Sequence, residues 1–193
     1  MTFEEIHTRL AARFGERIGP LAPPNKDPFA VVPAADIVEI CRYLKDDSEL
    51  AFDCLMNLSS VDWPKKNQIE IVYHFWSYAK HHSFILKVAL DRAAPAIASL
   101  ESVWKAADWL EREQFDLMGV QFDGHPDLRR IMMPDDWVGF PLRKDYKEQP
   151  SWHNITTTRE NSLEGYVRLD EFRKYAAEAA AADAPAAKKE VLQ

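Results

Sequence analysis

Two stretches in the first half of the chain place an apolar residue at every second position, and this pattern limits the possible folds more than any other feature. In residues 68–76 these positions are Ile69, Ile71, Tyr73 and Phe75. In residues 83–90 they are Phe84, Leu86, Val88 and Leu90. A period of two is typical of a β-strand with one face in the core. We therefore predict two half-buried strands.

Turn-forming residues separate these strands from each other and from a third apolar stretch. Residues 64–67 (Pro-Lys-Lys-Asn) divide residues 50–61 from the first predicted strand, and residues 77–82 divide the two strands. Short turns of this kind connect antiparallel neighbours. The expected sheet is therefore an antiparallel meander.

Two amphipathic helices are expected before this sheet. Residues 3–14 have helical spacing, with Thr2 as the N-cap and Gly15 as the stop, and residues 35–46 have the same spacing. The apolar side of the second helix consists of Ile37, Ile40, Cys41 and Leu44. A short apolar run between the helices, residues 29–32, leads into a strand. Helices packed on one face of an antiparallel sheet make an α+β fold.

The second half of the chain is less regular. Residues 102–118 return to helical spacing, and Gly119 is the expected C-cap. Turn signals then follow one another closely in residues 123–141, which predicts an irregular but compact loop region.

The domain organisation follows from where apolar periodicity ends. After residue 146 it is weak until an Ala-rich helix expected at residues 169–182. We predict an α+β domain of residues 1–146 and an extended, partly helical C-terminal tail of residues 147–193, which lacks the apolar residues for a core of its own.

Composition and charge exclude several classes of function. A formal net charge of −7 argues against nucleic acid as a partner. Residues 1–15 lack the apolar core of a signal peptide, and no uncharged apolar run reaches the ~20 residues that span a bilayer. We therefore expect a cytoplasmic chain whose membrane association depends on partner proteins.

The residues needed for a cofactor or metal site are also missing. Cys41 and Cys54 are the only cysteines, too few for an iron–sulfur cluster, and no His spacing completes a zinc site. The six glycines are not clustered as in a phosphate-binding loop. We predict that this chain has no metal, cofactor-binding or catalytic residues.

Glu111 lies within the apolar arc of the helix in residues 104–118. An ionised carboxylate is costly to bury unless it meets a cation or several hydrogen-bond donors. The nearest candidate cations in the sequence are Arg129, Arg130 and Arg143.

Trp109 lies on the opposite, charged arc of the same helix, with Arg112, Glu113 and Asp116. A tryptophan in this position is either covered by the chain's own loop or exposed as the anchor of an interface. The sequence leaves both alternatives open.

His125 is the histidine with a possible chemical role. It follows Asp-Gly and precedes Pro, so it either locks the loop through hydrogen bonds or acts as a general base. The structural role is favoured because no nucleophile is identifiable. A carboxylate pair such as Glu111 with Glu113 does not suggest acid–base catalysis, because residues two apart on a helix do not face each other.

A longer pattern unites these residues. It consists of residues 111–113 (Glu-Arg-Glu), 116–118 (Asp-Leu-Met), 124–131 (Gly-His-Pro-Asp-Leu-Arg-Arg-Ile), 133–137 (Met-Pro-Asp-Asp-Trp) and 141–146 (Pro-Leu-Arg-Lys-Asp-Tyr). In order and spacing it resembles the signature of the small peripheral-arm subunit (C) of the respiratory NADH:quinone oxidoreductase, complex I. The pattern departs from the family at Asp108 and Leu110, where Asn and Tyr are usual, and at Lys147-Glu148, where Pro-Leu is usual.

This resemblance implies a cofactor-free structural subunit in the quinone-reducing module of a proton-translocating complex. The implied partners are the large quinone-site subunit (D) and the two iron–sulfur subunits (B and I), and FMN, iron–sulfur clusters, NADH and quinone would be bound by partner subunits. The implied location is peripheral, on the cytoplasmic side of the inner membrane, with the tail as an arm across neighbouring subunits. The residues implied in structure or interfaces are Trp109, Glu111, Arg112, Glu113, Asp116, His125, Arg129, Arg130, Arg143 and Asp145.

Two alternatives stay open at the level of sequence. One is the equivalent subunit of a related enzyme: a membrane-bound hydrogenase, a dehydrogenase of the reduced deazaflavin coenzyme or a ferredoxin:quinone oxidoreductase. The other is a free-standing hydrolase that uses His125 with Asp123 or Asp127.

Overall fold

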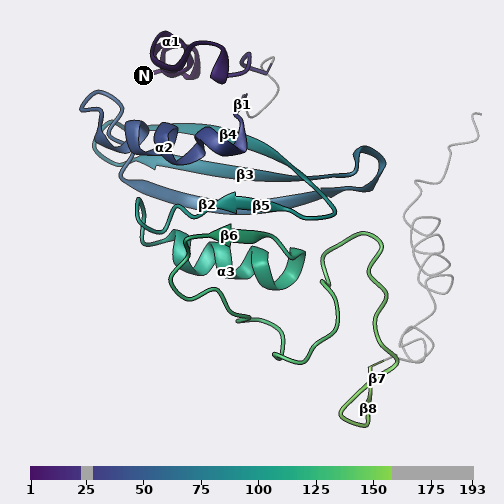
Figure 1. Cartoon of the computed structure of the whole chain (residues 1–193). Helices are drawn as coiled ribbons and strands as arrows, with labels where there is room; N and C mark the ends of the chain where they lie inside the picture. The colour runs from purple at the N-terminus through teal and green to yellow at the C-terminus, as the bar shows by residue number, and fades with distance from the viewer. Residues whose placement is uncertain (23–27, 158–193) are drawn as a thin grey trace, which may run out of the picture. The chain divides into compact units, whose positions relative to one another are not determined.

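The computed structural model of the chain describes residues 1–22 and 28–157 (Figure 1). Contacts within the chain divide it into two compact units, Met1–Lys147 and Glu148–Gln193. The helix predicted at residues 169–182 lies outside the described residues, as does most of the predicted tail.

Both predicted N-terminal helices are present. Helix α1 is Phe3–Phe14, and its N-terminus is a capping box: the Glu5 N–H donates to the Thr2 hydroxyl at 3.3 Å, and the Glu5 carboxylate accepts from the Thr2 N–H at 2.9 Å. Helix α2 is Ile37–Asp46, and its predicted apolar side is buried. Short 3₁₀ turns follow α1 and precede α2.

The meander is confirmed by strands β2 (Cys54–Trp63), β3 (Gln68–Ser77) and β4 (His82–Asp91), which pair antiparallel. A further strand, β1 (Ala30–Val31), pairs parallel with β4, so the sheet order is β1-β4-β3-β2 and the sheet is mixed rather than purely antiparallel. The sequence predicted a strand here but not its direction, because apolar periodicity does not depend on which strand lies alongside.

The sequence did not reveal four short strands. Strands β5 (Ala96–Ala98) and β6 (Gln121–Asp123) form a parallel pair, and the chain between them contains helix α3 (Ala107–Met118). In the second unit, β7 (Ser151–Trp152) and β8 (Ile155–Thr156) form a small hairpin. Segments of two or three residues are too short to show a period.

A single hydrophobic core joins one face of the sheet to all three helices, which confirms the α+β fold. The alternating residues of β3 and β4 predicted to face inward are all buried, and the same cluster includes Ala107 and Met118 of α3. The indole N–H of Trp104 donates to the Phe52 carbonyl at 3.1 Å, which ties the start of α3 to the segment before β2. The core therefore fixes the position of α3 beside β2, as Figure 1 shows.

Tyr73 gives a test of this packing. Its side chain is fully buried, and its hydroxyl has no hydrogen-bond partner among the described residues, which costs about 1–3 kcal/mol relative to solvent. We expect Tyr73→Phe to leave the free energy of unfolding unchanged or to raise it by about 1 kcal/mol in urea denaturation. The control is Tyr146→Phe, which removes the acceptor of the Trp137 indole N–H at 2.9 Å and should lower stability. A clear loss for Tyr73→Phe would contradict the assignment of an unpartnered hydroxyl.

Candidate functional site

Helix α3 ends at a glycine that the surrounding loop requires. Gly119 has a left-handed φ of +73°, and a Cβ at this position would lie 2.5 Å from the Phe140 ring. Any other residue would therefore have both a strained backbone and a steric clash. The guanidinium groups of Arg130 and Arg143 lie 5.8 and 4.8 Å from the centroid of the same ring. Arg143 Nε also donates to the Met118 carbonyl at 2.8 Å, which caps the C-terminal end of the helix.

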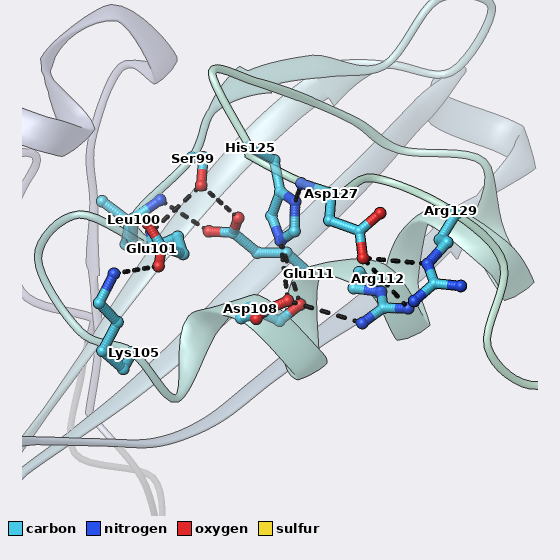
Figure 2. A network of polar contacts seen from close by, with 10 residues as sticks. All are labelled: Ser99, Leu100, Glu101, Lys105, Asp108, Glu111, Arg112, His125, Asp127 and Arg129. Atoms are coloured by element: carbon cyan, nitrogen blue, oxygen red, sulfur yellow. Dashed lines mark hydrogen bonds and ion pairs between the residues drawn. The ribbon is translucent and has the colours of Figure 1, made fainter.

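The inward-facing carboxylate of α3 is Glu111, which is fully buried as predicted. It accepts a hydrogen bond from the Ser99 hydroxyl at 2.6 Å and another from the Leu100 backbone N–H at 2.7 Å (Figure 2). The sequence predicted either a cation or several hydrogen-bond donors for this carboxylate, and the structure shows donors. Arg130 and Arg143, two of the candidate cations, instead contact the opposite side and the end of the helix. Burial raises the pKa of Glu111, and its two hydrogen bonds partly oppose that rise.

Three charged residues form a row along the other side of α3, each one helical turn after the one before it: Asp108, Arg112 and Asp116. We call them the clamp residues. Arg112 and Asp116 are buried although they lie on the arc expected to be charged and solvated. A buried charge requires partners. The loop that follows β6 supplies them, and successive residues of this loop meet successive clamp residues of the helix.

The first two clamp residues hold the beginning of this loop. The His125 ring lies against Asp108, with Nε2 3.4 Å from the Asp108 carboxylate and 3.2 Å from its backbone carbonyl (Figure 2). Arg112 lies between two carboxylates, 3.8 Å from Asp108 and 3.9 Å from Asp127. The loop is therefore attached to the helix by polar contacts one turn apart.

Asp116 makes the strongest of these attachments. One of its carboxylate oxygens accepts backbone N–H hydrogen bonds from Ile131, Met132 and Met133, at 3.0, 2.6 and 2.8 Å. The other carboxylate oxygen lies 3.5 Å from an Arg130 nitrogen, too far for a good hydrogen bond but close enough for an ion pair. The Asp116 side chain is completely buried, so the three backbone hydrogen bonds to one oxygen and the ion pair of the other take the place of solvent.

The hydrogen bonds of His125 define its tautomer and its role. Nδ1 accepts from the Asp127 backbone N–H at 3.1 Å, so the proton of a neutral ring is on Nε2, which donates to Asp108. The side chain is completely buried. Both ring nitrogens of His125 are therefore engaged within the chain, and the side chain has no access to solvent.

A second ionic cluster fixes the end of the loop, and among its charged side chains the sequence singled out only Asp145. Arg92 binds the buried Asp62 through two nitrogens, at 2.6 and 3.0 Å, and also binds Asp145 at 2.5 Å. Asp62 further accepts from the Lys144 backbone N–H at 2.8 Å. The Arg92 guanidinium lowers the pKa of Asp62. Asp62 could have been recognised from the alternation of β2, which places it on the core side after Leu58.

The other predicted residues are more accessible. Trp109 is 63% exposed and lies against Arg112, whose guanidinium carbon is 4.8 Å from the ring centroid, so the described loop does not cover it. Arg129 is exposed and bonds to Asp127 at 3.0 Å, and Glu113 is half-buried. Of the two alternatives for Trp109, the exposed one is observed.

The part of the chain that the structure describes contains neither a metal-binding cluster nor a helix that could cross a membrane. Within residues 1–22 and 28–157, no group of three or more His, Cys, Asp or Glu side chains is placed to hold a metal ion. None of the helices described is long and apolar enough to cross a membrane.

Comparison with known proteins identifies the family. Residues 30–151, which include α3, the clamp residues and the loop, match the family model described as respiratory-chain NADH dehydrogenase, 30 Kd subunit. The chain belongs to this family. The match confirms the resemblance seen in the pattern of residues 111–146.

Individual relatives agree with the family. The chain is 41% identical over 154 residues to the NADH-quinone oxidoreductase subunit (C) of Chloroherpeton thalassium, a match covering 79% of this chain and 64% of the relative. It is 40% identical over 160 residues to the corresponding subunit of Chlorobium phaeobacteroides, covering 79% and 96%. Among solved structures, a chain of an archaeal membrane-bound sulfane sulfur reductase, a respiratory membrane complex, superposes with a TM-score of 0.64 at 25% identity, covering 75% of this chain and 85% of that one.

The clamp predicts a large difference between two aspartates. Asp116→Ala removes the charged acceptor of three partly buried backbone N–H groups, so we expect a loss of about 3 kcal/mol or more in the free energy of unfolding. Amide hydrogen exchange at residues 131–133 should accelerate as well. The control, Asp127→Ala, removes a half-exposed carboxylate from ion pairs and should cost less than about 1 kcal/mol. Equal losses for the two variants would contradict the dominance of Asp116.

Glu111 predicts a distinctive dependence of stability on pH. Its folded pKa lies above its unfolded value, so the folded state binds more protons and the contribution of Glu111 to stability falls as pH rises above about 4.3. Glu111→Gln keeps the shape and can still bond Ser99 and Leu100, but it does not titrate. We expect the stability of the variant relative to the unsubstituted chain to increase from pH 4 to pH 7 in urea denaturation. Parallel stability curves would show that the pKa of Glu111 is not raised.

Proposed function

We propose that this chain is a structural subunit of a proton-translocating NADH:quinone oxidoreductase and supplies no catalytic or cofactor-binding group of its own. The observation that supports this most directly is that its buried charged residues and His125 already have partners within the chain. Glu111, Asp116 and His125, which together look like an active site in the sequence, are all buried and bonded within the chain. Such a site holds a loop in place and offers no group to a substrate.

The proposed partners are the large quinone-site subunit (D) and the two iron–sulfur subunits (B and I), which this chain would brace for electron transfer to quinone. FMN, iron–sulfur clusters, NADH and quinone would then be bound by those partner subunits. The family match and the relatives that are named as the same subunit of NADH-quinone oxidoreductases support this assignment. The corresponding location is peripheral, on the cytoplasmic side of the inner membrane, with attachment through the complex.

A second candidate is the equivalent subunit of a related respiratory complex with a different donor or acceptor. This candidate is supported by the similarity to a chain of the archaeal sulfane sulfur reductase, which covers 75% of the present chain. Activity of the purified complex with NADH and quinone, compared with other donors, decides between the two. A free-standing hydrolase is disfavoured because the ring nitrogens of His125 are both engaged.

The proposal is tested through the exposed tryptophan. A tagged full-length chain, isolated from membranes in mild detergent, should bring down iron–sulfur and quinone-site subunits. Trp109→Ala should lower the amount of assembled complex severalfold, because an exposed aromatic ring is a typical interface anchor, while turnover per assembled complex stays the same. The matched control is Lys105→Ala, one turn earlier and highly exposed, which should assemble normally.

Recovery of the chain alone would contradict membership of the complex. Normal assembly of the Trp109→Ala variant with lost turnover would contradict the structural role, because it would mean that this region takes part in catalysis.

A further inference from the structure

The four-stranded sheet has a second face, turned away from the core. Side chains alternate along a strand, so the neighbours of the buried residues of β3 point to this side. The strand register adds residues from β1, β2 and β4 to the same side. We call this surface the outer face; the residues used below are Val31, Met56, Val61, Trp63, Glu70, Val72, His74, Ile85 and Lys87.

The outer face is more apolar than a solvated sheet surface should be. Antiparallel sheets with one face in water usually carry polar residues there. Here Val31, Met56, Val61 and Trp63 are 44, 58, 36 and 41% exposed and come from the two edge strands of the sheet. Large exposed apolar side chains gathered on one rigid surface are typical of a protein interface.

The charges of the outer face are unevenly placed. In its centre Glu70 and Lys87 neutralise each other at 2.8 Å. At the β2–β3 turn, Lys65 and Lys66 are exposed, and Lys66 lies 5.0 Å from the centroid of the Trp63 ring. No carboxylate within residues 1–22 and 28–157 forms an ion pair with either of these lysines. Asp91, exposed in the same row as Trp63, accepts a hydrogen bond from the Asn67 side-chain amide at 3.1 Å. The surface is thus an apolar strip whose corner carries two lysines and one carboxylate, on a chain whose net charge is −7.

A hollow lies at the other end of the strip. It has a volume of about 300 Å³. Its lining combines outer-face residues with residues before β1, of α1 and of the core side: Met56, His74, Ser83 and Ile85 together with Phe3, Pro28, Phe75 and Phe84. The Nδ1 atom of His74 is buried without a hydrogen-bond partner among the described residues. A buried polar atom of this kind is costly unless a further group reaches it. The hollow can accept a side chain that carries a hydrogen-bonding group.

We propose that the outer face is the docking surface for a different protein chain, whose contact region has an apolar strip, acidic residues opposite Lys65 and Lys66, and a hydrogen-bonding side chain that enters the hollow at His74. This inference rests on the proposed function, in which the chain is one subunit of a complex. A second copy of the chain is disfavoured because two chains that each carry a net charge of −7 repel each other. Two lysines are too few to hold a phosphate-rich surface, which requires a cluster of basic residues.

The experiment uses the tagged full-length chain in its native membranes, with p-benzoylphenylalanine in place of Val61. After illumination, isolation under denaturing conditions and mass spectrometry identify what is bound. We expect a covalent adduct with one other subunit of the complex, on a peptide that contains Asp or Glu. The control position is Ala12, exposed on α1, which packs on the opposite side of the sheet and should not yield this adduct.

The charge requirement is tested by a second variant. Lys65→Glu with Lys66→Glu should lower the yield of the adduct at least about fivefold, because like charges across an interface are repulsive. Lys105→Glu, a charge reversal at an exposed lysine outside the outer face, should leave it unchanged. Equal yields from both variants would overturn the charge complementarity.

Other adducts would also overturn the proposal: with a second copy of the chain, with another part of the same chain, with lipid, or none at all. The failure of this inference is distinguishable from that of the proposed function. If other subunits of the complex accompany the tagged chain but position 61 forms no adduct with them, the outer face is free and membership of the complex stands. If no other subunit accompanies the chain, both proposals fail.

Discussion

The burial of charge on helix α3 is the constraint on which the second half of the structure depends. Glu111 on one side of the helix and Asp116 on the other are both fully buried. Each must find donors within the chain, because an unpaired buried carboxylate would cost more than a domain of this size can sustain. Ser99 and Leu100 satisfy the first, and the backbone of residues 131–133 satisfies the second. The paths of the turn before α3 and of the loop after β6 follow from these two requirements.

In this arrangement, a segment dense in Glu, Arg, His and Asp uses its buried charged groups for contacts within the chain. Clamp residues at one-turn intervals bind a loop that contains little regular structure, and Gly119 with Phe140 closes its far end. The hydrogen bonds that a catalytic group would offer to a substrate are used within the chain. A loop held in this way has a fixed shape without strands or helices, which suits a surface that other proteins must match.

The two faces of the sheet differ in the same way. One face packs in the core that it shares with three helices, whereas the outer face has apolar side chains exposed to solvent. A chain that functioned alone would gain nothing from this exposure. Together with exposed Trp109 on α3, the outer face indicates that the surface is shaped by contacts beyond the chain.

Much of the fold was determined by the sequence itself, because local periodicity reports burial. The alternation in β3 and β4, the apolar side of α2 and the caps at Thr2 and Gly119 were all readable, and the family pattern in residues 111–146 was decisive for the family. Only the tertiary structure decided which donors meet Glu111, that Asp62 and Arg92 anchor Asp145, and that β1 runs parallel to β4. The side-chain hydrogen bonds among these contacts join residues from 11 to 53 positions apart along the chain. Such pairings depend on how elements pack in space, and periodicity contains no information about which distant element supplies the partner.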